Sequence, residues 1–307
     1  MVDGHALDLS AWVHGGPDAQ GVPAHDFSTN SNACGPCPIA MQAVREADAT
    51  HYPDPHYHAL RTRLAQWHGV SPERVVLAGS GSEFIRRITA WVRGLADALA
   101  TGGPSVYWPV HGYGDYAHAA QAWGLPQASA REHATLIWAC APSSPMGQTD
   151  ADELASLRQI QAHQHGVLDL AYAPLCLHDS SDSPWAALRD RVWQMWTPNK
   201  ALGMTGVRGA YAIAPLQAQA VVPQLQALAP SWVLGGHAVA MLTAWTEDAV
   251  QQWLRASLDT LRDWKDQQVA LCQSLGWQVA ESEANYFCAR LPQALSEAQW
   301  QRMREKG

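Results

Sequence analysis

An apolar run that ends in a carboxylate decides the fold class of this chain: residues 166–172 read GVLDLAY. Residues 166–170 have the length and the aliphatic composition of a buried strand. Asp169 is expensive to bury at the end of such a strand unless a cation faces it. A protonated nitrogen of a heterocyclic ligand would be such a cation, so this strand end indicates both a sheet and a binding site.

Helical and strand periods alternate on both sides of this run. Apolar spacing predicts helices over residues 57–68, 82–100, 113–123 and 150–164, and strands over 74–78, 105–108, 135–141, 166–170, 192–196 and 210–214. This βαβ pattern predicts an α/β fold with a mostly parallel sheet sandwiched by helices. Ligands of such sheets bind beyond the carboxyl ends of the strands.

The pattern changes after about residue 230. Residues 247–275 predict one long helix, residues 277–280 and 286–289 predict short strands, and a closing helix starts near Ser296. We therefore expect three parts: an N-terminal arm (1–48) packing with the small domain, a large domain (49–230) and a smaller α+β domain (231–307).

Composition favours a small-molecule partner. The chain has 307 residues, a net charge of −8 and only 20 Lys and Arg, which argues against binding nucleic acid or an anionic membrane surface. No apolar run approaches the roughly 18 residues of a membrane span, and the first residues lack the features of a signal peptide. We expect a cytoplasmic enzyme.

Cys34 and Cys37 enclose the sequence CGPC, the spacing of a thioredoxin-like dithiol. No apolar strand precedes it, and no second cysteine or histidine pair follows to complete a zinc site. A thiol-disulfide exchanger is thus a remote alternative, and we expect no metal.

Several loops that follow predicted strands carry polar residues. Residues 79–83 read GSGSE and enter a helix whose N–H groups suit a phosphate, although Phe84 replaces the third glycine of a dinucleotide fingerprint. A plain helix entry remains the alternative for this loop. Lys200 and Arg208 flank a glycine-rich loop, and a solvated surface pair is the alternative for them.

The series Asp169-x-x-Tyr172, Thr197-x-x-Lys200 and Arg208 resembles the aspartate aminotransferase superfamily of fold type I, class I/II pyridoxal-phosphate (PLP) enzymes. The resemblance spans nearly the whole chain. It implies that Lys200 bonds covalently to PLP, that Asp169 holds the ring nitrogen protonated, and that Tyr172 contacts the ring hydroxyl.

The resemblance assigns further cofactor contacts to the loops. The phosphate would be held by Gly81, Ser82, Thr197 and Arg208, with Glu83 in the same cofactor-binding turn. Tyr113 would stack on the ring, with His111 as the alternative. Ser144 stands where the family usually has an asparagine that contacts the ring hydroxyl.

Residues 51–55, HYPDP, resemble the histidinol-phosphate aminotransferase branch and its relative, the threonine-phosphate decarboxylases of cobalamin synthesis. Tyr52 would then reach the cofactor phosphate of a neighbouring subunit, which implies a homodimer with shared sites. His14-Gly15-Gly16 and residues 26–32, DFSTNSN, favour the decarboxylase branch. We therefore expect a lyase acting on a phosphorylated amino acid or amine, with an aminotransferase as the alternative. The substrate contacts would be His14, Asn32 and Gly35.

One departure concerns the carboxylate-binding arginine that the superfamily carries late in its small domain. The chain stops at Gly307 before such a segment, and Arg302 and Arg304 match no such position. We expect either an incomplete small domain or loss of that clamp. In the second case a PLP-binding scaffold with weak or altered catalysis is a further alternative.

Overall fold

The computed structural model describes residues 15–17, 19, 21–95, 103–178 and 184–306. Contacts divide the chain into two compact units, Ser31–Arg290 and Met1–Asn30 with Leu291–Gly307. The candidate site residues from Asn32 onward belong to the first unit. His14 lies outside the described residues.

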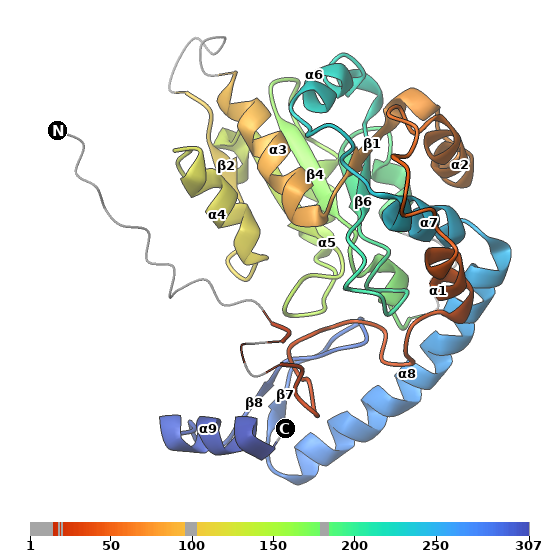
Figure 1. Cartoon of the computed structure of the whole chain (residues 1–307). Coiled ribbons are helices and arrows are strands. Elements are labelled where there is room, and N and C mark those ends of the chain that lie inside the picture. Colours follow the sequence, from red (N-terminus) through yellow and green to blue (C-terminus); the bar gives the residue numbers. More distant parts are fainter. Residues whose placement is uncertain (1–14, 18, 20, 96–102, 179–183, 307) are drawn as a thin grey trace. The chain divides into compact units, whose positions relative to one another are not determined.

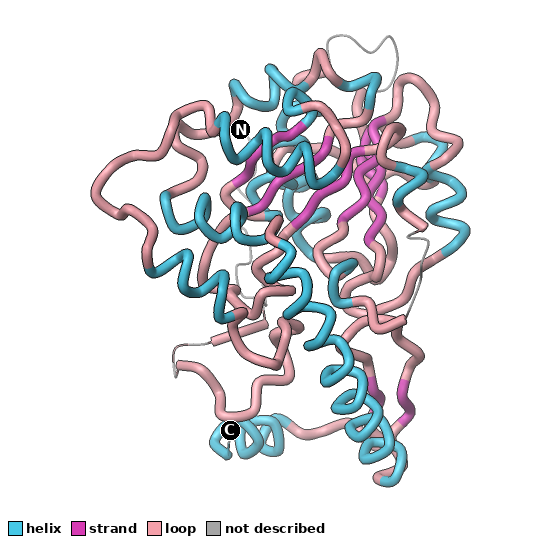
Figure 2. The backbone as a smooth tube through the Cα atoms, turned by 90° about the vertical axis from the view of Figure 1, so that its right-hand side faces the viewer, coloured by secondary structure: helices cyan, strands magenta, loops and turns pink. Residues whose placement is uncertain are grey.

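A six-stranded sheet forms the centre of the unit Ser31–Arg290, and Figure 2 shows its strands running side by side. The strand order is β1-β6-β5-β4-β3-β2. Strands β2 to β5 are parallel, whereas β6 is antiparallel to both β1 and β5. The confirmed α/β sheet therefore brings the carboxyl ends of β1 to β5 and the start of β6 to one edge. The strands are β1 (Val75–Ala78), β2 (Val106–Tyr107), β3 (Leu136–Cys140), β4 (His165–Asp169), β5 (Trp193–Trp196) and β6 (Ala210–Ile213).

Helices cover both faces of the sheet because successive side chains of each strand point to opposite sides. One hydrophobic cluster joins Trp138 and Trp193 to α3, α4 and α6, and the other joins Ile137 and Leu168 to α1, α2, α5, α7 and α8. Figure 1 shows α3 beside α4, in agreement with their contacts. The helices are α1 (Pro38–Arg45), α2 (His58–His68), α3 (Gly81–Arg93), α4 (Gly114–Ala122), α5 (Ala151–Leu157), α6 (Val222–Ala227), α7 (Gly236–Trp245) and α8 (Asp248–Ser274).

The long helix α8 leads to a small antiparallel sheet of β7 (Gln278–Val279) and β8 (Ala289–Arg290). Lys265 of α8 donates from Nζ to the carbonyl oxygens of Ser282 (2.5 Å) and Ala284 (2.7 Å). This lysine thereby fixes the turn between the two strands. Among the described residues, no helix combines the length and the apolar character that a membrane crossing needs.

In the other unit, Asp26 caps its own turn by accepting hydrogen bonds from the Ser28 N–H (2.7 Å) and the Thr29 N–H (3.1 Å). Its last element is α9 (Glu297–Lys306). Arg304 of that helix donates to the carbonyl oxygen of Gly21 at 3.2 Å.

The observed elements differ from the predicted ones at several ends. The helix predicted to reach residue 164 ends at Leu157, and a turn closed by Gln164 on the Gln161 N–H (2.9 Å) follows it. The last predicted strand begins only at Ala289, because Lys265 and Ser282 hold the preceding residues in a turn. The contact units also differ from the predicted boundaries at 48 and 230, since α1 and α7 pack against each other within one unit.

Candidate active site

The edge where the parallel strands end carries most of the predicted site residues. Asp169 is the last residue of β4, and Lys200 follows β5. The register pairs Asp169 with Cys140 of β3 and with Met195 of β5, so the carboxylate lies near the middle of the sheet. Arg208 comes just before β6, whose antiparallel direction brings its start to the same edge.

Asp169 is buried and hydrogen-bonded within the chain. The residue is 4% exposed; its Oδ1 accepts from the Ala171 N–H at 2.9 Å and its Oδ2 accepts from the Tyr116 hydroxyl at 2.7 Å. Burial raises the pKa of this carboxyl, and the Tyr116 hydrogen bond, the Lys200 charge and the Ala171 N–H oppose that shift. A ligand that brings a positive charge to this carboxylate would therefore be favoured.

Lys200 holds its amine close to this carboxylate. Its Nζ donates to Thr197 Oγ1 at 3.2 Å and lies 5.3 Å from the centre of the Tyr172 ring. Burial lowers the pKa of Lys200, and the Arg208 charge lowers it further, while Asp169 raises it. A lysine with a lowered pKa has more of the neutral amine, which is the nucleophile that attacks carbonyl groups. We call Tyr116, Asp169, Tyr172 and Lys200 the ring end of the site.

Asn32 fixes the backbone that carries Lys200. Its N–H donates to the Lys200 carbonyl oxygen at 2.9 Å, and its Nδ2 donates to the Ala201 carbonyl oxygen (3.0 Å) and to Ser257 Oγ (2.7 Å). Asn32 Oδ1 accepts from the Cys34 N–H at 3.0 Å. The Asn32 side chain, which was predicted to contact substrate, therefore makes these hydrogen bonds within the protein. A substrate contact by Asn32 stays a prediction.

Gly35, the other described residue predicted to contact substrate, also has a backbone role. It has a φ of +88°, where glycine is favoured because it lacks a Cβ. Its carbonyl oxygen packs so closely against Gly203 that a Cβ on Gly203 would lie 2.5 Å away. Both glycines therefore allow the N-terminal segment to run against the loop that follows Lys200.

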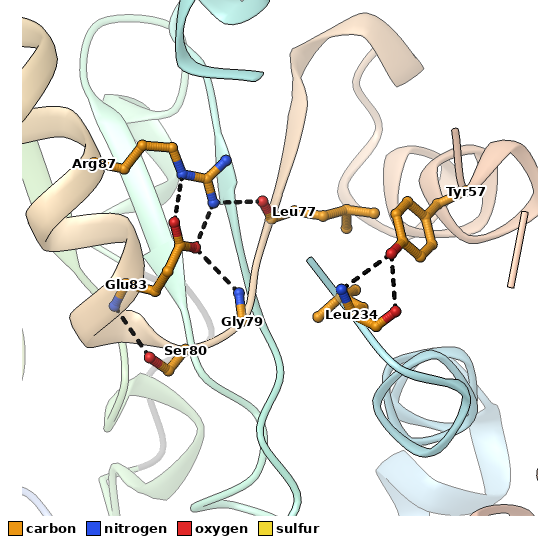
Figure 3. A network of polar contacts seen from close by, with 7 residues as sticks. All are labelled: Tyr57, Leu77, Gly79, Ser80, Glu83, Arg87 and Leu234. Atoms are coloured by element: carbon orange, nitrogen blue, oxygen red, sulfur yellow. Dashed lines mark hydrogen bonds and ion pairs between the residues drawn. The ribbon is translucent and has the colours of Figure 1, made fainter. Parts of the chain in front are cut away.

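The entry to α3 is tied into a polar network, which Figure 3 shows. Ser80 caps the helix by accepting from the Glu83 N–H at 3.0 Å, and Glu83 accepts from the Gly79 N–H at 3.1 Å. Arg87 donates to Glu83 Oε1 (2.8 Å) and to the Leu77 carbonyl oxygen (2.8 Å). Glu83 was predicted to bind the cofactor, yet its side chain and N–H make their contacts inside this turn.

Gly81 and Ser82 begin α3, where the helix offers their N–H groups no partner of its own. A Cβ on Gly81 would lie 3.0 Å from Thr197 Cγ2, so this helix end lies directly against the loop after β5. Arg208 is exposed, and it makes no hydrogen bond or ion pair with any residue that the structure describes. We call Gly81, Ser82, Thr197 and Arg208 the phosphate end of the site.

Tyr113 lies between the two ends. Its hydroxyl is 3.4 Å from Ser82 Oγ, and burial raises its pKa to about 12. His111, the alternative for the ring-stacking position, is exposed. The loop after β3 places the partly buried Ser144 in the segment that Tyr286 contacts, since the Tyr286 hydroxyl donates to the Ser143 carbonyl oxygen at 2.8 Å.

The sequence analysis did not assign two of the tyrosines that lie at the site. Tyr116 contacts Asp169, and the ring of Tyr286 packs edge-on against Tyr172 with centroids 4.8 Å apart. The only sequence signal for Tyr116 is its place three residues after Tyr113, on the same side of a helix. Nothing in the local pattern singles out Tyr286, whose contacts come from residues distant in the sequence.

Tyr52 lies on the surface. It is 77% exposed and stacks on Trp232, with ring centroids 4.3 Å apart. Trp232 in turn donates from Nε1 to the Pro53 carbonyl oxygen at 3.1 Å. The tyrosine is therefore held in place with its ring available to another molecule.

Cys34 of the CGPC segment lacks the lowered pKa of a reactive thiol. Both cysteines are free, Cys37 is buried at the start of α1, and burial raises the pKa of Cys34. Reactive thiols have a lowered pKa. The raised pKa of Cys34 therefore argues against the thiol-disulfide alternative.

The geometry fits pyridoxal phosphate. The ring end offers an amine of lowered pKa and a buried carboxylate for a protonated ring nitrogen. The phosphate end offers helix N–H groups and an exposed guanidinium, which suit a phosphate.

Comparison with known proteins agrees with this fit. A histidinol-phosphate aminotransferase from Ruegeria pomeroyi is 25% identical over 305 residues, covering 92% of this chain and 81% of that protein. The crystal structure of histidinol-phosphate aminotransferase from Sinorhizobium meliloti with pyridoxal-5'-phosphate has a TM-score of 0.78 at 20% identity, covering 98% of this chain and 85% of the other. The L-threonine-O-3-phosphate decarboxylase from Porphyromonas gingivalis has a TM-score of 0.63 at 18% identity, covering 86% and 82%.

These two structures share the aspartate aminotransferase-like fold with this chain. The model of the family "Aminotransferase class I and II" matches residues 23–307, nearly the whole sequence. The chain therefore belongs to the class I and II aminotransferases and is a pyridoxal-phosphate-dependent enzyme.

Proposed function

We propose that this chain is an aminotransferase of the histidinol-phosphate type, acting on a small phosphorylated amine or amino acid. The observation that carries the proposal is the 25% identity to a histidinol-phosphate aminotransferase over 92% of the chain. The arrangement of Lys200, Asp169 and Arg208 around one sheet edge supports it. This choice reverses the expectation from the N-terminal segment, which favoured a decarboxylase.

In this proposal three residues of the ring end act on the cofactor or the substrate. Pyridoxal phosphate, when bound, withdraws electrons from the substrate carbon at which a bond is broken. Asp169 keeps the proton on the ring nitrogen, and Tyr172 hydrogen-bonds the ring hydroxyl. Lys200 would supply the amine that holds the cofactor, and the same amine would move a proton at the substrate Cα.

The remaining site residues hold the cofactor in position. Tyr113 packs on the ring face, and Ser144 contacts the ring hydroxyl in place of the usual asparagine. The N–H groups of Gly81 and Ser82, the Thr197 hydroxyl and the Arg208 guanidinium bind the phosphate.

A threonine-phosphate decarboxylase is the second candidate. Residues 26–32 favour it, and a solved structure of that enzyme shares the fold. The same residues would serve both reactions, because the reaction depends on which Cα bond is held perpendicular to the ring. Its structural likeness, with a TM-score of 0.63 against 0.78, is the weaker of the two.

One pair of assays separates these candidates. The protein loaded with cofactor is incubated with histidinol phosphate and 2-oxoglutarate, and separately with threonine phosphate. Glutamate from the first mixture without carbon dioxide from the second supports the aminotransferase. Carbon dioxide without glutamate would establish the decarboxylase instead. Cofactor binding without either product would leave the scaffold alternative, and Lys200→Ala is the background control for all assays.

We also propose a homodimer with shared sites, in which Tyr52 contacts the cofactor phosphate bound by the other subunit. The exposure of Tyr52 and its stacking on Trp232 support this role. A mixed dimer of Lys200→Ala and Tyr52→Phe chains tests it. If Tyr52 acts across the interface, one site of the mixed dimer regains both native residues and wild-type cofactor affinity. A monomer by sedimentation, or a mixed dimer with only the weak affinity of Tyr52→Phe, would reject it.

A cytoplasmic location stays a prediction.

A further inference from the structure

We propose that Tyr116 is a positioning residue for Asp169, which it holds oriented and ionised for the ring nitrogen of the cofactor. The inference rests on the proposed role of Asp169. It assigns a function to a tyrosine that neither the sequence motifs nor the family series includes.

Tyr116 cannot easily move away from Asp169. The residue is fully buried in α4, and its ring is stacked on Trp138 with centroids 4.5 Å apart and planes 9° apart. Tyr113 packs edge-on against it at 5.8 Å. Packing on the ring face and at its edge fixes the direction of the hydroxyl, which points at Asp169 Oδ2 from 2.7 Å.

The two hydrogen bonds to Asp169 leave it able to bind a ligand. Tyr116 donates to Oδ2 and the Ala171 N–H donates to Oδ1. Each carboxylate oxygen can accept a second hydrogen bond. The carboxylate is thus held at both oxygens while a lone pair on each remains for a donor such as a protonated ring nitrogen.

The charge on Asp169 needs this support because its surroundings are mostly uncharged. Lys200 is the cation among the groups that interact with it, and in the proposed function Lys200 commits its amine to the cofactor. The Tyr116 hydroxyl is a donor that stays in place throughout, and hydrogen bonds to a carboxylate favour its ionised form. The titratable groups that face Asp169 are Tyr113 before α4, Tyr116 of α4, Cys140 of β3, Lys200 after β5 and Tyr286 before β8.

The test measures cofactor affinity against pH in Tyr116→Phe, by titrating the visible absorption of the bound cofactor in the absence of substrate. Without the hydroxyl, Asp169 takes up a proton at higher pH. The acidic fall in affinity should therefore move upward by about one pH unit, so that affinity drops about tenfold at pH values below both midpoints. Tyr116→His places an N–H donor on the side-chain ring in place of the hydroxyl. It should move the pH midpoint of cofactor affinity back toward the wild-type value.

Two controls separate positioning from packing. Trp138→Phe leaves an aromatic ring to pack on Tyr116 and keeps the hydroxyl, so it should lower the thermal midpoint of unfolding and move the pH midpoint much less than Tyr116→Phe does. Tyr116→Phe should have no further effect in an Asp169→Asn background, because the titrating group is absent.

An unchanged pH midpoint in Tyr116→Phe, an equal shift in Trp138→Phe, or a shift that persists with Asp169→Asn would each overturn the proposal. A wild-type protein that borohydride fails to label at Lys200 would refute the proposed function instead. The two failures are therefore distinguishable.

Discussion

At the ring end of the site Asp169 has both carboxylate oxygens hydrogen-bonded within the chain, whereas at the phosphate end Arg208 extends an exposed guanidinium that meets no polar partner among the described residues. The difference follows from burial. A charge that is 4% exposed, as Asp169 is, must find donors in the protein because water cannot reach it. Water solvates Arg208, so its guanidinium can stay without a protein partner at little cost in free energy.

The comparison indicates that substitutions at the two ends of the site should have different effects. Changes at the ring end alter the chemistry or the protonation of groups that are already in place. Changes at the phosphate end should weaken the binding of the cofactor while the fold stays intact.

Lys200→Ala should have the largest effect. The variant loses the amine that bonds to the cofactor, so activity should fall by about a thousandfold or more, while Thr197 loses only one hydrogen bond. The chain contains three lysines, Lys200, Lys265 and Lys306, which makes the labelling test sharp. Borohydride should attach the cofactor to the peptide that contains Lys200, and attachment at Lys265 or Lys306 would contradict the assignment.

Arg208→Ala should weaken cofactor affinity by roughly 10- to 100-fold, the usual value of a hydrogen bond to a charged group. Thermal unfolding of the cofactor-free protein should not change, because the side chain is exposed and unpaired among the described residues. Arg93→Ala, an exposed arginine at the other end of α3, is the matched control. Equal losses of affinity in both variants would show that the effect is general electrostatics.

Gly81→Ala tests the contact, within the phosphate end, between the start of α3 and the loop after β5. The added Cβ would lie 3.0 Å from Thr197 Cγ2 and 3.5 Å from Met195 Cε, so Thr197 or the start of α3 must move by a few tenths of an ångström. We expect a loss of about 1–3 kcal/mol in the free energy of unfolding, with weaker cofactor binding, measured by denaturant titration and by absorbance. Gly235→Ala, at a position where an added Cβ meets nothing within 4 Å, should cost far less. Similar losses for both glycines would argue against the close contact.

Cys34→Ser should have the smallest effect. Burial raises the pKa of Cys34, so at neutral pH it is a thiol and a poor nucleophile. Activity should be the same with and without a reducing agent, in wild type and variant alike. Reversible inactivation of the wild type by oxidation, absent in Cys34→Ser, would restore the dithiol interpretation.

Much of the fold followed from local pattern. Residues 57–68 and 247–275 were predicted as helices and are observed as α2 and α8 within a residue at each end. The strands from 74 to 214 were also found within a residue at each end, because short apolar runs between turns leave few other structures possible. α7 was missed, since a helix that is apolar on most sides has no clear period.

The candidate site was predictable to a lesser degree. The order Asp169, Tyr172, Thr197, Lys200, Arg208 is contiguous enough to be recognised in a sequence. Glu83 was assigned to the cofactor by its place in the turn 79–83, and Asn32 to the substrate by its place in the segment 26–32. Their side chains bind Arg87 and Ser257. Sequence spacing gives the position of a residue along the chain, but it does not say which groups its side chain meets.

The sequence by itself determined the α/β class and the PLP-dependent family. It also contains the series of residues to which the chemistry is assigned. Each of these is encoded in local periodicity or in a short motif. The tertiary structure alone decided how those residues are supported. Tyr116 reaches Asp169 across 53 positions and Asn32 reaches Ala201 across 169. These contacts exist because the sheet is ordered β1-β6-β5-β4-β3-β2, and the choice of neighbouring strands depends on the packing of the whole unit, which no local pattern contains.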